Sequence, residues 1–205
     1  RRIEVPVLRS HQAPIRLLHI SDLHMVPGQE SKSEWVRSLA SLSPDAVITT
    51  GDFLAHQEGV PSALEALGPL MEFPGAFVLG SNDYYSPKPI NPVKYFSGPS
   101  TITPTRQMLD WEPLAHGMSD NGWLDLTNTQ VDWKVGGRLI SVKGVDDPHI
   151  GRDDYAGITK SFNEQAELTL GVVHAPYLRV LDAMAADNAQ LILAGHTHGG
   201  QVRIP

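Results

Sequence analysis

The chain has 205 residues, a net charge of −7 and no cysteine. Hydrophobic residues make up 41% and charged residues 19%, as in ordinary globular proteins, and the length is sufficient for one α/β domain with a substantial core. The lack of cysteine excludes disulfides and thiolate metal ligands. The acidic balance argues against binding nucleic acid through a broad basic surface. No apolar run is long enough to cross a membrane.

We expect residues 1–205 to form a single domain that is truncated at both ends. The chain opens at Arg1 without Met and stops at Pro205, where the pattern of a new strand begins. We therefore interpret it as the soluble domain of a longer protein. The localisation of that protein is unknown, and its missing parts could associate it with a membrane or place it outside the cytoplasm.

The first half of the chain alternates between apolar runs and helical spacing. Residues 1–14 predict an edge strand. Three short, branched runs predict buried strands, and two stretches between them have the spacing of helices. The first helix is predicted to begin near Ser33 and to bury Trp35, Leu39 and Leu42. This order predicts a parallel sheet; the strands are 15–20, 46–50 and 76–79, and the second helix is 60–71.

The second half follows a different order. Residues 84–103 are rich in Pro, Ser, Gly and Asn and predict a loop, and residues 105–118 predict a helix. Three short runs then predict antiparallel strands, of which the last two meet at Gly136-Gly137. A strand, a helix and a last strand complete the chain. The predicted strands are 123–126, 129–135, 138–142, 168–173 and 190–194, with the last helix at 178–185.

Five of the predicted strands end in side chains that can bind a metal. Because the carboxyl ends of parallel strands meet at one edge of a sheet, we expect these side chains to converge. In the pair Asp22 and His24, the i, i+2 spacing would direct both side chains to one face if the strand geometry continued. His196 and His198 repeat this spacing. The strand-end residues are Asp22 and His24, Asp52, Asn82, His174, and His196 and His198.

These motifs resemble the signature of the calcineurin-like metallophosphoesterases. The family pattern D-x-H, G-D, G-N-H-[DE], a lone His and G-H-x-H corresponds here to Asp22-Leu23-His24, Gly51-Asp52, Gly80-Ser81-Asn82-Asp83, His174 and Gly195-His196-Thr197-His198. The trailing Gly199-Gly200-Gln201 resembles a branch that contains bacterial membrane-associated enzymes and some nucleotide-sugar pyrophosphatases.

The resemblance implies an α/β fold in four layers, α-β-β-α, with two mixed β-sheets flanked by helices. It places a binuclear metal site at the C-terminal ends of the strands. It implies that Asp22, His24 and His198 hold one metal, that Asp52 bridges, and that Asn82, His174 and His196 hold the other.

The ligand types fit two divalent ions, which could be Mn, Fe or Zn; we favour Mn. Two metals roughly 3.5–4 Å apart can lower the pKa of a bridging water and stabilise an in-line displacement at phosphorus. We therefore predict a metal-dependent phosphohydrolase, acting on a phosphodiester, a phosphomonoester or a pyrophosphate, with a bridging hydroxide as nucleophile. The alternative is a non-catalytic metal-binding scaffold of the same fold.

The third motif departs from the family pattern. An ungapped alignment places Ser81 at the ligand position and Asn82 at the position of the catalytic His, whereas a shift by one residue keeps Asn82 as a ligand and places Asp83 at the His position. We favour the shift, because an amide carbonyl is a better ligand than a neutral hydroxyl. Asp83 could then act only if a raised pKa kept it protonated. The predicted catalytic residues are Asp52, Asn82 and Asp83.

The missing His favours a substrate with a good leaving group, such as a pyrophosphate or an activated diester. The expected partner is a phosphorylated small molecule, a lipid or a nucleotide sugar, and not a nucleic acid. Predicted substrate contacts are Tyr84, directly after the third motif, and Asp147 and His149 in a polar loop.

Overall fold

The computed structural model describes residues 2–10, 12–87 and 106–197. Its strands form two four-stranded sheets. The first sheet has the order β1-β2-β3-β4 and the second has the order β5-β6-β7-β8. The strands are β1 Leu17–Ile20, β2 Ala46–Thr50, β3 Gly75–Val78, β4 Leu124–Asp125, β5 Thr129–Val135, β6 Arg138–Gly144, β7 Leu168–Val173 and β8 Leu191–Ala194.

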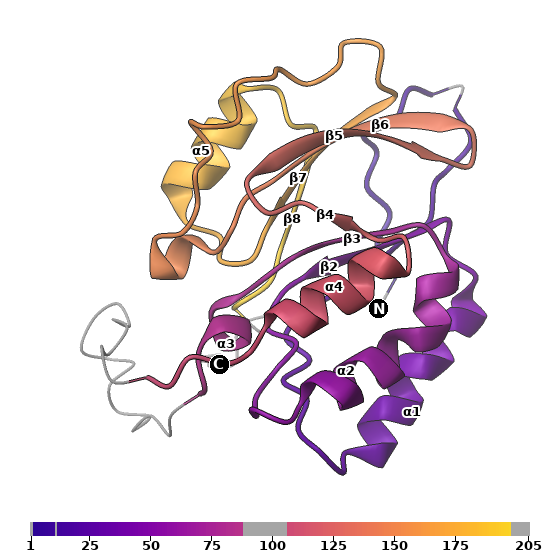
Figure 1. Ribbon diagram of the computed structural model, residues 1–205. Helices are drawn as coiled ribbons and strands as arrows, with labels where there is room; N and C mark the ends of the chain where they lie inside the picture. Colours follow the sequence, from indigo (N-terminus) through magenta and orange to yellow (C-terminus); the bar gives the residue numbers. More distant parts are fainter. Residues whose placement is uncertain (1, 11, 88–105, 198–205) are drawn as a thin grey trace, which may run out of the picture.

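The longer helices lie on the outer faces of these sheets. Figure 1 shows α1, α2 and α4 against the first sheet and α5 against the second, so that the layers follow the order α-β-β-α. The predicted four-layer α/β sandwich is confirmed. The helices are α1 Glu30–Ser38, α2 Val60–Leu67, α3 Ser81–Tyr84, α4 Glu112–Asp120 and α5 Leu178–Ala186, with short 3-10 turns η1 Leu39–Leu42, η2 Gly68–Glu72 and η4 Pro148–Ile150.

The central strands are mostly apolar because both of their faces are covered. All five residues of β2 are buried. Val47 packs in the core beneath α1, α2 and α4, whereas its neighbours Ala46 and Ile48 point into the core between the two sheets. A third core, built around Val173, Val180 and Met184, joins α5 to the second sheet. The strict alternation along β2 therefore fixes the order of the layers.

The first sheet is wholly parallel in the described residues, so the prediction of two mixed sheets holds only for the second. β4 pairs parallel with β3 and is not part of the predicted antiparallel meander. β5 and β6 do form the predicted antiparallel hairpin, but β6 then pairs parallel with β7. Parallel pairing needs a crossover, and the chain between β6 and β7 supplies it.

The predicted helices differ from the observed ones at their starts. α1 begins at Glu30, so Ser33 is a buried residue inside the helix and not its N-cap. Trp35 and Leu42 are 58% and 51% exposed, and Val36 takes the core position instead. α4 begins at Glu112 because Pro113 fits the first turn of a helix, where its missing N–H costs nothing.

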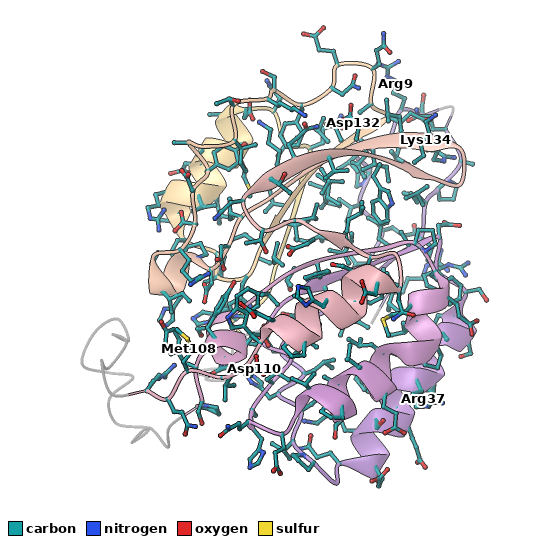
Figure 2. The ribbon with its side chains drawn as sticks, in the orientation of Figure 1. Arg9, Arg37, Met108, Asp110, Asp132 and Lys134 are labelled. Atoms are coloured by element: carbon teal, nitrogen blue, oxygen red, sulfur yellow. The ribbon has the colours of Figure 1, made fainter. Side chains whose placement is uncertain are left out.

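Two further expectations concern residues 1–14 and segments that could cross a membrane. The described residues before β1 contain no strand, in contrast to the edge strand predicted for residues 1–14. Figure 2 shows the side chains of Arg37, Asp132 and Lys134 on separate outer surfaces, α1 and β5. No helix in the described part of the chain has the length and apolarity needed to cross a bilayer.

Candidate metal centre

The carboxyl ends of β1, β2, β3, β7 and β8 meet at one edge of the two sheets. The parallel pairing of β1 with β2 continues past both strands, since the Asp22 N–H donates to Gly51 O at 3.0 Å and the His24 N–H donates to Asp52 O at 2.9 Å. In the second sheet, the Gly195 N–H donates to His174 O at 2.9 Å. These bonds carry the ligand-bearing segments side by side into the same region.

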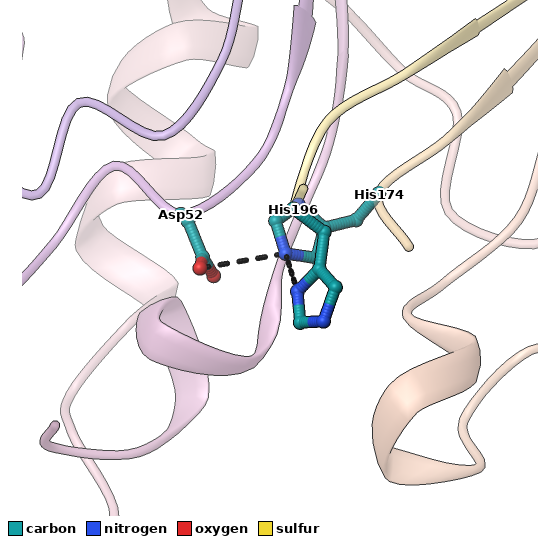
Figure 3. A group of neighbouring side chains, drawn as sticks. All are labelled: Asp52, His174 and His196. Carbon is teal, nitrogen blue, oxygen red and sulfur yellow. Dashed lines mark hydrogen bonds and ion pairs between the residues drawn. The ribbon is translucent and has the colours of Figure 1, made fainter. Parts of the chain in front are cut away.

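Two groups of possible ligands converge there, and they share one residue. Ligand atoms of Asp52, His174 and His196 all lie within 4.8 Å of one another, and so do those of Asp22, His24 and Asp52. Figure 3 shows the first group, with the Asp52 carboxylate facing the two imidazoles. His174 Nε2 is 3.4 Å from Asp52 Oδ2, and His24 Nε2 is 3.8 Å from the same oxygen. Asp52 therefore belongs to both candidate metal sites.

Four of these ligands have a left-handed backbone. Asp22, His24, Asp52 and His196 have φ values of 57°, 45°, 56° and 67°. The convergence of Asp22 with His24 is thus as predicted, but its reason is different: the chain leaves strand geometry at these residues. Left-handed backbone costs free energy in residues with a side chain, and such strain concentrates at functional sites.

Glycines beside the ligands allow the two sheets to approach. A Cβ at Gly80, after β3, would lie 2.8 Å from His174 Cε1 of the second sheet, and a Cβ at Gly195, after β8, would lie 1.9 Å from Ser21 Oγ of the first. No side chain fits at either position without movement of its neighbours. The glycines in Gly80-Ser81 and Gly195-His196 therefore have a packing reason, which is the close contact of the two strand ends.

The orientation of His174 is set by a hydrogen bond across the two sheets. His174 Nδ1 lies 2.6 Å from Thr50 O. A carbonyl only accepts, so Nδ1 carries the proton, and in the neutral imidazole Nε2 is left as the atom that can bind a metal. On the other side, the His196 N–H donates to both oxygens of the Asp22 carboxylate, at 3.2 and 3.0 Å. These contacts join the sheets at the centre.

The electrostatic field at the centre favours positive charge. Burial opposes ionisation of Asp52, but its hydrogen bond with His174 and the charges of His174 and His24 outweigh burial and lower the pKa of Asp52 below its usual range. Burial also disfavours a charged His174, yet the Asp52 carboxylate raises the His174 pKa to about 10. A cation at Nε2 of His174 is therefore stabilised by the surrounding carboxylates.

The pKa of His196 shifts in the opposite direction to that of His174. Burial and the nearby charge of His174 lower the pKa of His196 to about 4. A neutral imidazole is the form that binds metals. The field thus keeps His196 ready as a ligand near neutral pH.

The donor set fits divalent cations. Carboxylate oxygen and imidazole nitrogen suit Mn, Fe and Zn, and one carboxylate shared by two groups suits a pair of ions. Asp22, His24, Asp52, His174 and His196 would hold them. His198, the remaining predicted His ligand, lies outside the described residues.

Asn82 lies against the bridging carboxylate. Its backbone N–H donates to Asp52 Oδ1 at 2.8 Å, and its side-chain amide donates to Asp52 Oδ2 at 2.7 Å. Asn82 is therefore at the centre, as predicted, while its neighbour Ser81 is only 3% exposed. Both bonds use nitrogen atoms of Asn82. Ligation of an ion by its side-chain carbonyl oxygen stays a prediction.

Asp83 has a role that the sequence did not indicate. It is fully buried, and its two oxygens accept four backbone N–H groups, those of Asp52, Phe53, Leu54 and Gly80, at 2.7–3.1 Å. Burial and the charge of Asp52 raise the Asp83 pKa, but a protonated carboxyl would point its hydrogen at one of these donors. The prediction that Asp83 acts on a leaving group is therefore wrong: it holds the Asp52 segment in place.

The three predicted substrate contacts have different positions. Tyr84 is 1% exposed, and its hydroxyl donates to Asp146 Oδ1 at 2.9 Å. Asp147 is 0% exposed. Neither placement allows contact with a substrate, so these two predictions are wrong. His149 is half-buried, and its ring centroid is 4.8 Å from that of His196, so it lines the centre.

The chain is similar to known proteins in sequence and in fold. A sequence profile of the calcineurin-like phosphoesterases matches residues 15–200. The uncharacterized protein YpbG of Bacillus subtilis (strain 168) is 32% identical over 194 residues, which are 93% of this chain and 63% of YpbG. The uncharacterized metallophosphoesterase YkoQ of the same strain is 26% identical over 195 residues, with the same two coverages.

More distant similarities extend the comparison. The transmembrane protein with metallophosphoesterase domain of Bos taurus is 27% identical over 218 residues, covering 98% of this chain and 44% of that protein. The chain thus spans less than two thirds of the length of these relatives. The crystal structure of TT1561 of Thermus thermophilus superposes with a TM-score of 0.52 at 14% identity, over 88% of this chain and 81% of TT1561, which shows a shared fold.

Proposed function

The chain belongs to the calcineurin-like phosphoesterase family, and on that premise we propose that it is a metal-dependent phosphohydrolase. The observation that carries the proposal is the pair of ligand groups that share Asp52. Two divalent ions at such a site lower the pKa of bound water and polarise a phosphoryl group. We propose that both positions are filled and that Mn is the favoured metal.

The residues of the chain would have distinct tasks. Asp52 would hold both ions, and Asn82 keeps the two Asp52 oxygens in fixed directions. Asp83 fixes the backbone on which Asp52 stands. Because this set is held by buried hydrogen bonds, little reorganisation is needed when a substrate binds.

We propose that His149 and Arg152 contact the substrate phosphate. The Arg152 side chain is 40% exposed, its Nε donates to Asp146 Oδ2 at 2.7 Å, and its guanidinium lies 4.1 Å from the centre of the Tyr84 ring. Asp146 and Tyr84 thus hold the guanidinium in one orientation. A guanidinium fixed in this way can bind a phosphate with little further loss of side-chain entropy.

The proposed substrate is a phosphorylated small molecule, a lipid or a nucleotide sugar whose leaving group needs no protonation. The position of the family's His is taken by Asp83 in the favoured alignment, which is enclosed, and by Asn82 in the ungapped one, whose amide is not an acid. Rates measured across aryl phosphodiesters with leaving groups of different pKa test this. A steep fall in rate with rising leaving-group pKa is expected, and a flat dependence would show that another acid assists.

Hydrolysis of bis(p-nitrophenyl) phosphate with added Mn²⁺ tests the function itself. The wild-type chain should release p-nitrophenol. Asp52→Asn should abolish release, because the amide cannot bridge two cations as a carboxylate does. The matched control is Asp132→Asn on β5, away from the strand ends, which should keep wild-type activity (Figure 2). Binding of Mn²⁺ without release of product by the wild type would favour the scaffold alternative.

We also propose that the chain is part of a longer protein that is associated with a membrane. The support is the name of the bovine relative, a transmembrane protein with a metallophosphoesterase domain. Fractionation of cells that express the full-length protein tests this, and recovery only in the soluble fraction would contradict it.

A further inference from the structure

A sixth strand, β6, also ends at the metal centre. β6 pairs parallel with β7, with Gly144 opposite Val172, and the ladder continues one residue further because the Val145 N–H donates to Val172 O at 3.2 Å. Parallel pairing in this register brings the residues after Val145 alongside His174, which follows β7. The next two residues, Asp146 and Asp147, therefore emerge beside a metal ligand.

Asp147 has one satisfied oxygen and one that is not. Its Oδ1 accepts the N–H of His149 at 2.8 Å, as an N-cap of η4. Its Oδ2 is buried and has no hydrogen-bond partner in the described part of the chain. Among the buried side-chain atoms that share this condition there, it is the only carboxylate oxygen. A buried acceptor without a donor is costly, so the site needs a group that donates a hydrogen bond.

The surroundings of Asp147 indicate where that donor lies. The turn that Asp147 caps places the His149 ring 4.8 Å from the ring of His196. Burial raises the pKa of Asp147 to about 6, and the charges of His174 and Asp52 also act on it. Asp147 belongs to neither group of converging ligand atoms, so direct ligation does not fit.

We propose that Asp147 is a positioning residue of the metal centre, whose Oδ2 accepts a hydrogen bond from a water molecule held by the ion at Asp52, His174 and His196. The inference rests on the proposed binuclear centre. The carboxylate orients this water and adds negative charge beside the ion. Outer carboxylates of this kind typically change metal affinity by about 10–100-fold.

Substitution of Asp147 by Asn tests the proposal, because Asn is isosteric and keeps the Oδ1 cap. The affinity for Mn²⁺ is measured by isothermal titration calorimetry on chelator-treated protein, and the urea midpoint of the same protein is measured without metal. We expect Asp147→Asn to weaken the binding of one ion by about 10–100-fold. The urea midpoint should not fall, since an unsatisfied buried charge has been removed.

Two further variants complete the experiment. Asp147→Ser also keeps an N-cap acceptor and removes Oδ2, so it should weaken Mn²⁺ binding in the same way. Asp153→Asn is the matched control: Asp153 belongs to the same loop but pairs with Arg179, and Mn²⁺ affinity should be unchanged.

Three results would overturn the inference. A dissociation constant within twofold of wild type in both Asp147 variants would show that Oδ2 does not serve the ion. A lower urea midpoint with unchanged Mn²⁺ affinity would show a structural role only. Failure of the wild type to bind Mn²⁺ would overturn the binuclear centre as well, whereas normal wild-type binding confines the failure to Asp147.

Discussion

Two buried groups of charged side chains in this molecule differ in how their charges are balanced. One is the metal centre, formed by Asp22, His24, Asp52, His174 and His196. The other is the Lys143 cluster on the outer face of the second sheet, formed by Lys143, Tyr155, Phe162 and Asp187. In the cluster, the Lys143 ammonium pairs with the Asp187 carboxylate, and the Tyr155 hydroxyl donates to the same carboxylate at 2.9 Å.

In the Lys143 cluster, the chain itself balances the buried charge. Lys143 Nζ lies 4.8 Å from the Phe162 ring centre and 5.4 Å from that of Tyr155, so aromatic faces surround the cation. Lys143 belongs to a regular strand. At the metal centre, in contrast, ligands have left-handed backbone and the carboxylates favour an added cation. Buried charge therefore indicates a binding site when the chain itself does not neutralise it and when the backbone is strained to present it.

The largest predicted effect is stabilisation by Mn²⁺, which should depend on the metal centre and not on the Lys143 cluster. Two Mn²⁺ ions, each at about 100 times its dissociation constant, should raise the free energy of unfolding by about 5 kcal/mol. Asp52→Asn should remove most of this gain, because both ions need Asp52. Asp187→Asn should leave the gain unchanged. Urea unfolding with Mn²⁺ and with chelator measures it; equal gains in all three proteins would place the ions elsewhere.

The second prediction concerns the Lys143 cluster alone. Asp187→Ala should cost about 3 kcal/mol of unfolding free energy, because it leaves Lys143, which is 2% exposed, charged and unpaired. Lys143→Met should cost less than about 1 kcal/mol, since Met fills the aromatic surroundings and Asp187 is partly exposed to water. Urea unfolding of both variants and of the double variant is the measurement. A double variant as unstable as Asp187→Ala would contradict the role of the unpaired cation.

The third prediction is a pH dependence that only the metal centre should show. Asp147 has a folded-state pKa of about 6, above its unfolded value of about 3.9. The folded chain therefore keeps this proton to higher pH than the unfolded chain. The contribution of Asp147 to the free energy of unfolding falls as pH rises from about 4 to 6. Without metal, Asp147→Asn should gain on wild type across this range, by about 2–3 kcal/mol at pH 7. Parallel pH profiles of the two proteins would contradict the shift.

The sequence predicted which side chains converge better than it predicted the reason for their convergence. The apolar runs and the polar residues after them were sufficient to place Asp52 and His174 at the carboxyl ends of strands. The two strands belong to different sheets, and the sequence spacing does not show the packing of the sheets that brings the two side chains together. For Asp22 and His24, however, strand alternation was the wrong reason, since both residues have left-handed backbone. Local spacing cannot reveal such turns, because backbone contacts from the neighbouring strand impose them.

Residues whose role depends on distant backbone groups were not predictable. Asp83 accepts N–H groups from Asp52 to Leu54, some thirty residues earlier in the chain. Asp147 reaches the centre only because β6 pairs with β7, a pairing that the hairpin pattern of residues 129–142 did not indicate. Trp35 was expected in the core because its spacing fits a helix face, but spacing alone does not say which face is covered.

The last and smallest prediction tests whether close packing of the strand ends serves the metal centre. A Cβ at Gly195 would lie 1.9 Å from Ser21 Oγ and 2.9 Å from Thr50 Oγ1. Gly195→Ala should therefore cost about 1–3 kcal/mol in urea unfolding. It should also weaken Mn²⁺ binding, because the next residue, His196, is displaced from Asp22. Gly68→Ala is the control, since a Cβ there meets nothing within 4 Å. Adding Ser21→Ala removes the nearest atom and should restore part of both losses. If Gly195→Ala lowers stability and leaves Mn²⁺ affinity unchanged, the contact serves packing alone, and the metal centre tolerates the displacement of the strand end.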